Sequence, residues 1–86
     1  MKLYSVILSK KVQKGFESIP ADYVKKIHKS LSSLSLNPRP LGYKKLICSE
    51  NYYRIRVGMY RIVYTIQDDI LIVEIIKIDH RRNVYR

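Results

Sequence analysis

Cationic and apolar side chains alternate through residues 52–66, Tyr-Tyr-Arg-Ile-Arg-Val-Gly-Met-Tyr-Arg-Ile-Val-Tyr-Thr-Ile. If Gly58 and Met59 form a two-residue β-turn, one face of the resulting hairpin carries Arg54, Arg56 and Arg61. Arg56 then lies directly opposite Arg61. Like charges opposed across two strands destabilise a sheet by up to about 1 kcal/mol, so a functional reason for keeping them is expected. Guanidinium groups bind phosphate oxygens in two-point contacts, which predicts a phosphate-binding face.

The last strand brings further candidates to the same end of the sheet. A turn at residues 68–69 predicts a strand over 70–78 that runs back beside the hairpin and ends near Gly58. The segment that follows therefore starts next to the arginines and contributes His80, Arg81, Arg82, Tyr85 and Arg86. RNA cleavage needs cations around the phosphate and groups that transfer protons or stack on bases. This combination predicts RNA binding or cleavage.

The same turn fixes a register for the last strand. The predicted cross-strand pairs are Ile66 with Leu71, Tyr64 with Val73, Ile62 with Ile75, and Arg61 with Ile76. Leu71, Val73 and Ile75 would then join the core face. Glu74, diagonal to Arg61, is the expected salt-bridge partner of that arginine. An apolar patch beside the arginines would consist of Val63, Ile70, Ile72 and Ile76.

The first half of the chain predicts a strand and two helices. Residues 2–8 are rich in β-branched and aromatic side chains and predict a strand, after which Ser9 can cap a helix over 10–19. Pro20 suits the start of a second helix, whose apolar stripe is formed by Val24, Ile27, Leu31 and Leu34. The loop 37–42 ends this helix, and a short strand over 43–47 adds Lys44 and Lys45 to the basic surface.

These elements predict one α+β domain over residues 1–86, in the order β-α-α-β-β-β-β. The two N-terminal helices would pack on one face of an antiparallel-rich sheet. That face consists of Tyr53, Ile55, Val57, Tyr60, Ile62 and Tyr64, and a one-residue slip in register would exchange it with the arginine face.

Composition favours a polyanionic partner. The 86 residues carry a formal net charge of +10 at pH 7, which attracts nucleic acid or an acidic protein. No apolar run is long enough to span a membrane, and residues 1–9 lack the pattern of a signal peptide, which favours the cytoplasm. Cys48 is the single cysteine and the two histidines are far apart, so we expect neither a metal site nor a cofactor, and any nuclease activity should be metal-independent.

Three segments together resemble the RelE/ParE superfamily of toxins: the hairpin 53–64, the loop Asn-Pro-Arg-Pro-Leu-Gly at 37–42, and His-Arg-Arg-Asn-Val-Tyr-Arg at 80–86. The similarity is greatest to the RelE branch, whose members cut mRNA in the A site of the 30S ribosomal subunit and are held inactive by a RelB-type antitoxin. The resemblance implies a RelE-like fold and a catalytic set of Arg54, Arg56, Arg61, Arg81 and Tyr85. Around it, the expected RNA-binding residues are Lys44, Lys45, His80, Arg82 and Arg86.

Some assignments remain open at this point. Arg81 or Arg82 is the basic tail residue of the site, and His80 is a further candidate for proton transfer. The resemblance implies mRNA, the ribosome and an acidic RelB-like antitoxin as partners. The alternatives are a ParE-like toxin that binds DNA gyrase without nuclease activity, and a non-catalytic RNA-binding module.

Overall fold

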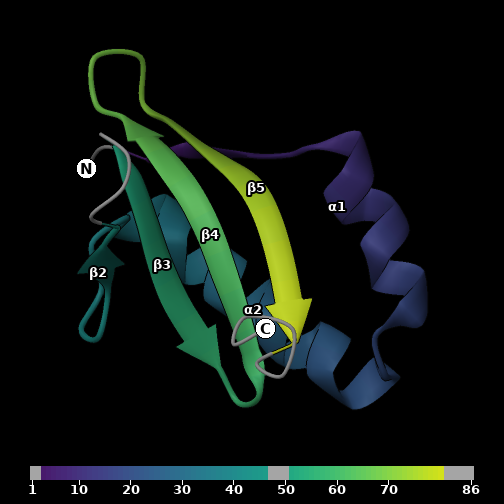
Figure 1. Ribbon diagram of the computed structural model, residues 1–86. Coiled ribbons are helices and arrows are strands. Elements are labelled where there is room, and N and C mark those ends of the chain that lie inside the picture. The colour runs from purple at the N-terminus through teal and green to yellow at the C-terminus, as the bar shows by residue number, and fades with distance from the viewer. Residues whose placement is uncertain (1–2, 47–50, 81–86) are drawn as a thin grey trace.

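The computed structural model describes residues 3–46 and 51–80, and its elements follow the predicted order (Figure 1). A single 3₁₀ turn, Phe16–Ser18, joins the two helices. The helices and strands are β1 (Ser5–Leu8), α1 (Lys10–Gly15), α2 (Ala21–Leu36), β2 (Lys44–Lys45), β3 (Tyr52–Val57), β4 (Tyr60–Gln67) and β5 (Ile72–His80). The predicted α+β class is confirmed.

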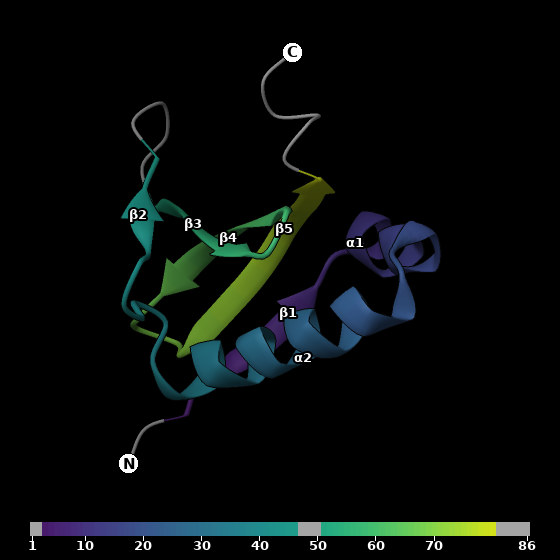
Figure 2. The same cartoon turned by 90° about the horizontal axis from the view of Figure 1, so that it is seen from below.

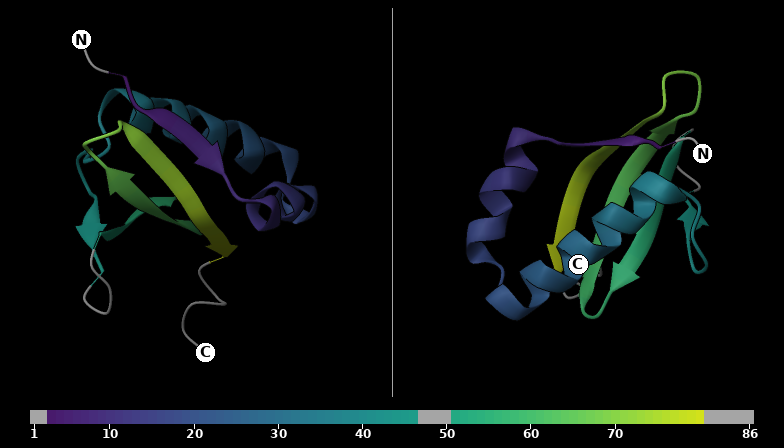
Figure 3. Two further views of the ribbon diagram at one scale, coloured as in Figure 1. Left: turned by 90° about the horizontal axis from the view of Figure 1, so that it is seen from above. Right: turned by 180° about the vertical axis from the view of Figure 1, so that it is seen from behind.

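The strands form one sheet in the order β1-β5-β4-β3-β2. β1 runs parallel to β5, and each of the other neighbouring pairs is antiparallel. Figure 2 shows both helices on the same side of this curved sheet, and the rear view of Figure 3 shows α2 crossing its face. Within the described residues, no helix covers the opposite face of the sheet.

The core lies between α2 and the helix-facing side of the sheet. The predicted stripe of α2 contributes Ile27, Leu31 and Leu34, which share one buried cluster with side chains of three strands. Strand members of this cluster include Tyr53, Ile55, Ile62, Tyr64, Val73 and Ile75. The alternation of apolar and charged side chains along the hairpin therefore determines which face of the sheet is buried, because burying apolar area is the main favourable term in folding.

The hairpin turns at Gly58 for two physical reasons. Gly58 has a φ of +58°, which is favourable for glycine and costly for most other residues. In addition, the ring of Tyr23 on α2 lies so close that a Cβ atom on Gly58 would be 2.7 Å from its Cε1. With Val57 opposite Tyr60, the turn holds the predicted β3–β4 register.

The predicted register of β5 is wrong. Residues 68–71 form a longer loop in which Leu71 has a φ of +55°, so Ile66 pairs with Val73 instead of Leu71. Between Val63 and Tyr64 the register shifts again, which leaves one residue of β5 as a bulge. The pairs beyond this bulge are Ile62 with Ile78, Arg61 with Asp79, and Tyr60 with His80.

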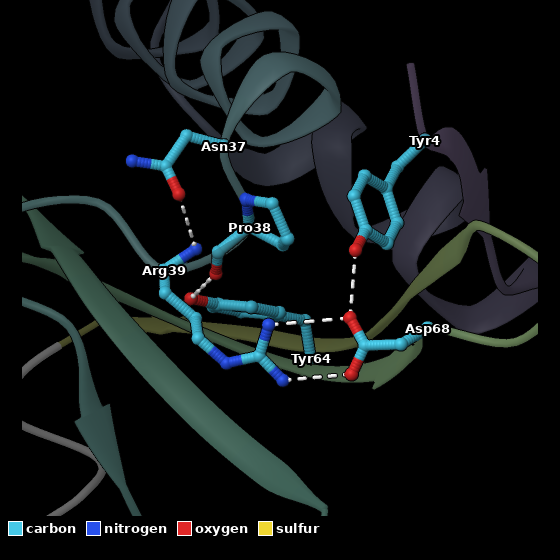
Figure 4. Close-up of polar contacts among 6 residues, drawn as sticks. All are labelled: Tyr4, Asn37, Pro38, Arg39, Tyr64 and Asp68. Carbon is cyan, nitrogen blue, oxygen red and sulfur yellow. Dashed lines mark hydrogen bonds and ion pairs between the residues drawn. The ribbon is translucent and has the colours of Figure 1, made fainter. Parts of the chain in front are cut away.

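A network of polar contacts that was not predicted from the sequence holds the longer loop between β4 and β5 (Figure 4). The Arg39 guanidinium donates two hydrogen bonds to the Asp68 carboxylate, at 2.9 and 3.2 Å, and the Tyr4 hydroxyl donates a third at 2.6 Å. Asp68 thus joins the loop after α2 to Tyr4, just before β1, and these contacts hold the turn at residues 68–71 in place. Nearby, the buried Tyr64 hydroxyl donates to the Pro38 carbonyl at 2.7 Å.

Tyr64→Phe should destabilise the fold by about 1–2 kcal/mol, because it removes a buried hydrogen bond and leaves the Pro38 carbonyl without this donor. Burial also raises the pKa of Tyr64 to about 12, so the hydroxyl stays protonated as a donor. Urea unfolding measures the change. Tyr43→Phe, at an exposed ring, is the matched control and should shift stability by less than about 0.5 kcal/mol. Equal effects of the two variants would contradict this role of Tyr64.

The Asp68 network should make stability depend on acid pH. Hydrogen bonds from Arg39 and then Tyr4 lower the pKa of Asp68 from 3.8 to about 2. A carboxyl group with a lowered pKa in the folded state stabilises the fold above pH 3.8, and this contribution is lost as the pH falls toward 2. The urea midpoint of the natural chain should therefore fall more steeply over this range than that of Asp68→Asn. Parallel pH profiles would contradict the assignment.

Candidate functional site

The three hairpin arginines lie on the sheet face without a helix, as predicted. Arg54 pairs with Val63 across β3 and β4, and Arg56 pairs with Arg61. Their neighbours along β3, Tyr53, Ile55 and Val57, are buried in the core on the opposite face. Arg56 is exposed, whereas Arg54 and Arg61 are half-buried.

The bulge brings a carboxylate beside the arginines that sequence reasoning missed. Asp79 lies directly opposite Arg61, and its Oδ2 is 2.9 Å from Nζ of Lys77. Glu74, the predicted partner of Arg61, lies instead opposite Thr65, four residues further along β4. The prediction for Glu74 is therefore wrong, because the loop at residues 68–71 is longer than the assumed two-residue turn and shifts the register of β5 by two residues before the bulge begins.

The predicted lysines of β2 separate onto the two faces. Lys44 pairs with Arg54 and shares the arginine face, whereas Lys45 pairs with Tyr53 and belongs to the helix side. By register, the cations of the arginine face are Lys44, Arg54, Arg56, Arg61 and Lys77. Along the described strands, the carboxylates on this face are Glu74 and Asp79, so positive charge dominates.

His80 lies at the same end of the sheet but on the helix side. It pairs with Tyr60, and the two rings meet edge to face with centroids 5.2 Å apart. His80 is the last residue of β5, and its pairing with Tyr60 places the end of the strand next to the Gly58 turn, as predicted. The other predicted tail residues lie outside the described part of the chain: Arg81, Arg82, Tyr85 and Arg86.

Arg61 carries an unusual donor. Its Nε atom is buried and, within the described residues, has no hydrogen-bond partner. An unsatisfied buried donor costs about 1–3 kcal/mol, so native proteins rarely keep one without a use. A guanidinium that turns toward a bound anion would satisfy this donor, which is consistent with a binding role for Arg61.

The apolar patch predicted on the arginine face is not present as an exposed patch. Val63 is buried, and Ile72 and Ile76 are half-buried. Ile70 is exposed, but it lies in the loop at the far end of the sheet from Gly58. The arginine face is therefore mainly a charged surface.

Comparison with known proteins identifies the family. The family model for the ParE toxin of the type II toxin–antitoxin system, parDE, matches residues 6–85. The chain belongs to the ParE/RelE toxin family. Toxin RelE3 of Methanocaldococcus jannaschii is 34% identical over 84 residues, which cover 93% of both chains.

Two solved structures support the RelE branch. The RelE–RelB complex of Pyrococcus horikoshii OT3 has a TM-score of 0.83 at 26% identity, over 92% of this chain and 96% of that one. The RelBE2 toxin–antitoxin complex of Mycobacterium tuberculosis has a TM-score of 0.81 at 26% identity, over 94% of each. The chain is thus a RelE-like toxin of a type II toxin–antitoxin system, as the resemblance predicted.

The described residues bring together no group of three His, Cys, Asp or Glu side chains that could hold a metal ion. Across residues 3–46 and 51–80, no helix is long and apolar enough to cross a membrane.

Arg56→Gln should stabilise the toxin by about 0.5 kcal/mol, because it removes the like-charge pair with Arg61. Urea unfolding at low and high salt measures this gain, which should shrink as salt screens the exposed charges. Lys25→Gln on the exposed side of α2 removes the same charge without relieving that pair and should gain less. A loss of stability in Arg56→Gln would show that the opposed arginines support the fold.

Proposed function

We propose that this RelE-like toxin is a ribosome-dependent mRNA endonuclease that cuts in the A site of the 30S subunit. The observation that supports this most is the pairing of Arg56 with Arg61 on an uncovered face, where β5 leads into the tail. Such a pair has a cost in the free protein, which a phosphate between the two guanidinium groups would remove.

In the proposed reaction the 2′-oxygen of the RNA attacks the adjacent phosphorus, and the bond from phosphorus to the 5′-oxygen breaks. The 2′-hydroxyl gives up its proton to a base, and the departing 5′-oxygen takes a proton. The products are a 2′,3′-cyclic phosphate and a 5′-hydroxyl. Arg54, Arg56 and Arg61 supply the positive charge that stabilises the pentavalent phosphate, without a metal ion.

Arginine stays protonated and is a poor proton donor or acceptor, so other groups must transfer the protons. We assign this chemistry to the end of the chain, where Tyr85 and His80 are the candidates and Arg81 or Arg82 adds charge. The remaining cations would guide the RNA to this end of the sheet: Lys44, Lys45 and Arg86.

The proposed partners follow from charge and from the related complexes. The net charge of +10 fits mRNA and ribosomal RNA, and it also fits an acidic RelB-like antitoxin. RelE of Pyrococcus horikoshii OT3 was solved in complex with RelB. We therefore expect a cytoplasmic toxin that an antitoxin keeps from the ribosome by covering the arginine face.

Arg61→Ala should lower the rate of mRNA cleavage by about 10²–10³, the usual cost of removing one donor that stabilises a transition state. Single-turnover cleavage on programmed ribosomes measures this rate. Lys25→Ala, an exposed cation on α2, is the control for general charge and should retain most of the rate. Melting curves of both variants show that they fold. Cleavage by Arg61→Ala at the natural rate would overturn the proposed role of Arg61.

A second candidate function is inhibition of DNA gyrase, because the matching family model is described as ParE. The two candidates separate in parallel assays. A gyrase toxin would block supercoiling by purified gyrase and leave programmed ribosomes intact, whereas the proposed nuclease would do the reverse.

A further inference from the structure

A cavity of about 430 Å³ lies between α1 and the last residues of β5, close to the edge of the arginine face. β1 pairs with β5 only as far as Ile75, so the last part of β5 faces α1 and the 3₁₀ turn with no strand between them. The residues that line the cavity come from both sides of this gap. Its walls come from α1, from the turn after it, and from residues 76–80 of β5.

The chemistry of the lining combines rings, cations and apolar groups. Tyr60 and His80, held edge to face, form an aromatic wall. Val12 and Ile19 supply apolar surface, and Lys11 adds a positive charge from α1. The Asp79 carboxylate also lines the cavity, but the ion pair with Lys77 balances its charge.

We propose that this cavity binds one unstacked nucleotide of the RNA, next to the phosphate held by the arginines. A base needs a flat aromatic partner and acceptors at its edge, which Tyr60, His80 and Asp79 provide. Its phosphate needs a cation, which Lys11 provides. The choice of RNA as ligand rests on the function proposed above.

The position of the cavity supports this choice. Asp79 lines the cavity and lies opposite Arg61, so one residue of β5 borders both the cavity and the arginine face. An RNA strand that lies on the arginines and crosses the end of β5 would therefore place its next base here. An acidic peptide would gain from Lys11, but it has less use for the aromatic wall formed by Tyr60 and His80.

Gly15 allows the cavity to be filled without disturbing the core. It lines the cavity, and a Cβ atom added there would meet nothing within 4 Å. Its backbone is helical, with φ −61° and ψ −26°, so larger residues fit the conformation. Gly15→Ala should fold at least as well as the natural chain, since alanine favours a helix. Gly15→Leu adds bulk at the same position.

The test is the binding of a fluorescent 2′-O-methyl hexanucleotide to the full toxin without ribosomes, measured by anisotropy. Gly15→Ala adds one methyl group to the cavity and should lose less binding than Gly15→Leu. Gly15→Leu should bind about 5–10-fold more weakly, in line with the loss of one stacked base. This loss should persist at higher salt, because stacking does not depend on ionic contacts. Melting curves confirm that both variants fold.

Two lysines of α1 allow a second comparison. Lys11 and Lys14 are both exposed, but only Lys11 lines the cavity. Lys11→Ala should weaken binding more than Lys14→Ala at the same salt concentration. Equal losses in the two lysine variants, together with unchanged binding by Gly15→Leu, would overturn the proposal in favour of a diffuse basic surface.

A third outcome is also decisive against the cavity as an RNA site. If Gly15→Leu weakens the binding of an acidic antitoxin peptide and leaves the hexanucleotide unaffected, the cavity is a protein site. The 2′-O-methyl RNA cannot be cut through its 2′-hydroxyl, so this assay measures binding without cleavage, and the comparison of Gly15→Leu with the natural chain isolates the cavity. Cleavage on ribosomes by the natural chain reports on the proposed function separately.

Discussion

The alternation of side chains on either side of Gly58 is the constraint on which the rest of this structure depends. The turn is held by a positive φ at Gly58 and by the Tyr23 ring above it, so the two strands have one register. In that register every second side chain of β3 enters the core, and the arginines between them face away from the helices. A slip of one residue would bury three cations beneath α2. The free energy needed to bury these unpaired charges would exceed the stability of a small domain.

The bulge in β5 adds a second constraint, which sets the charge balance of the site. Without it, Arg61 would face an apolar side chain. With it, Arg61 faces Asp79, which also engages Lys77. The carboxylate offsets part of the repulsion between Arg56 and Arg61, and it leaves the face positive enough to attract phosphate. The same shift turns Ile78 toward the core and His80 toward Tyr60.

The local parts of this architecture could be predicted from sequence. A glycine between two alternating segments indicates a hairpin, and the stripe of α2 indicates its buried side. The β4–β5 loop could not be predicted in this way, because Asp68 binds Arg39 and Tyr4, partners that are distant in the chain. A signal for the bulge did exist: the core positions of β5 change from Val73 and Ile75 to Ile78, which breaks the period of two. The face on which the arginines lie was predicted correctly. The position of Asp79 opposite Arg61 was not predicted, because it depends on the bulge.

In the proposed reaction, the arginine face stabilises a phosphate that is attacked by the RNA's own 2′-hydroxyl. The most direct measurement uses ribosomes programmed with an mRNA that has a single 2′-O-methyl group at the A-site nucleotide to be cut. The toxin should cut the unmodified mRNA, leave a 2′,3′-cyclic phosphate at the cut, and leave the modified mRNA intact. Cleavage of both mRNAs at the same rate would show that another nucleophile attacks and that the proposed reaction is wrong.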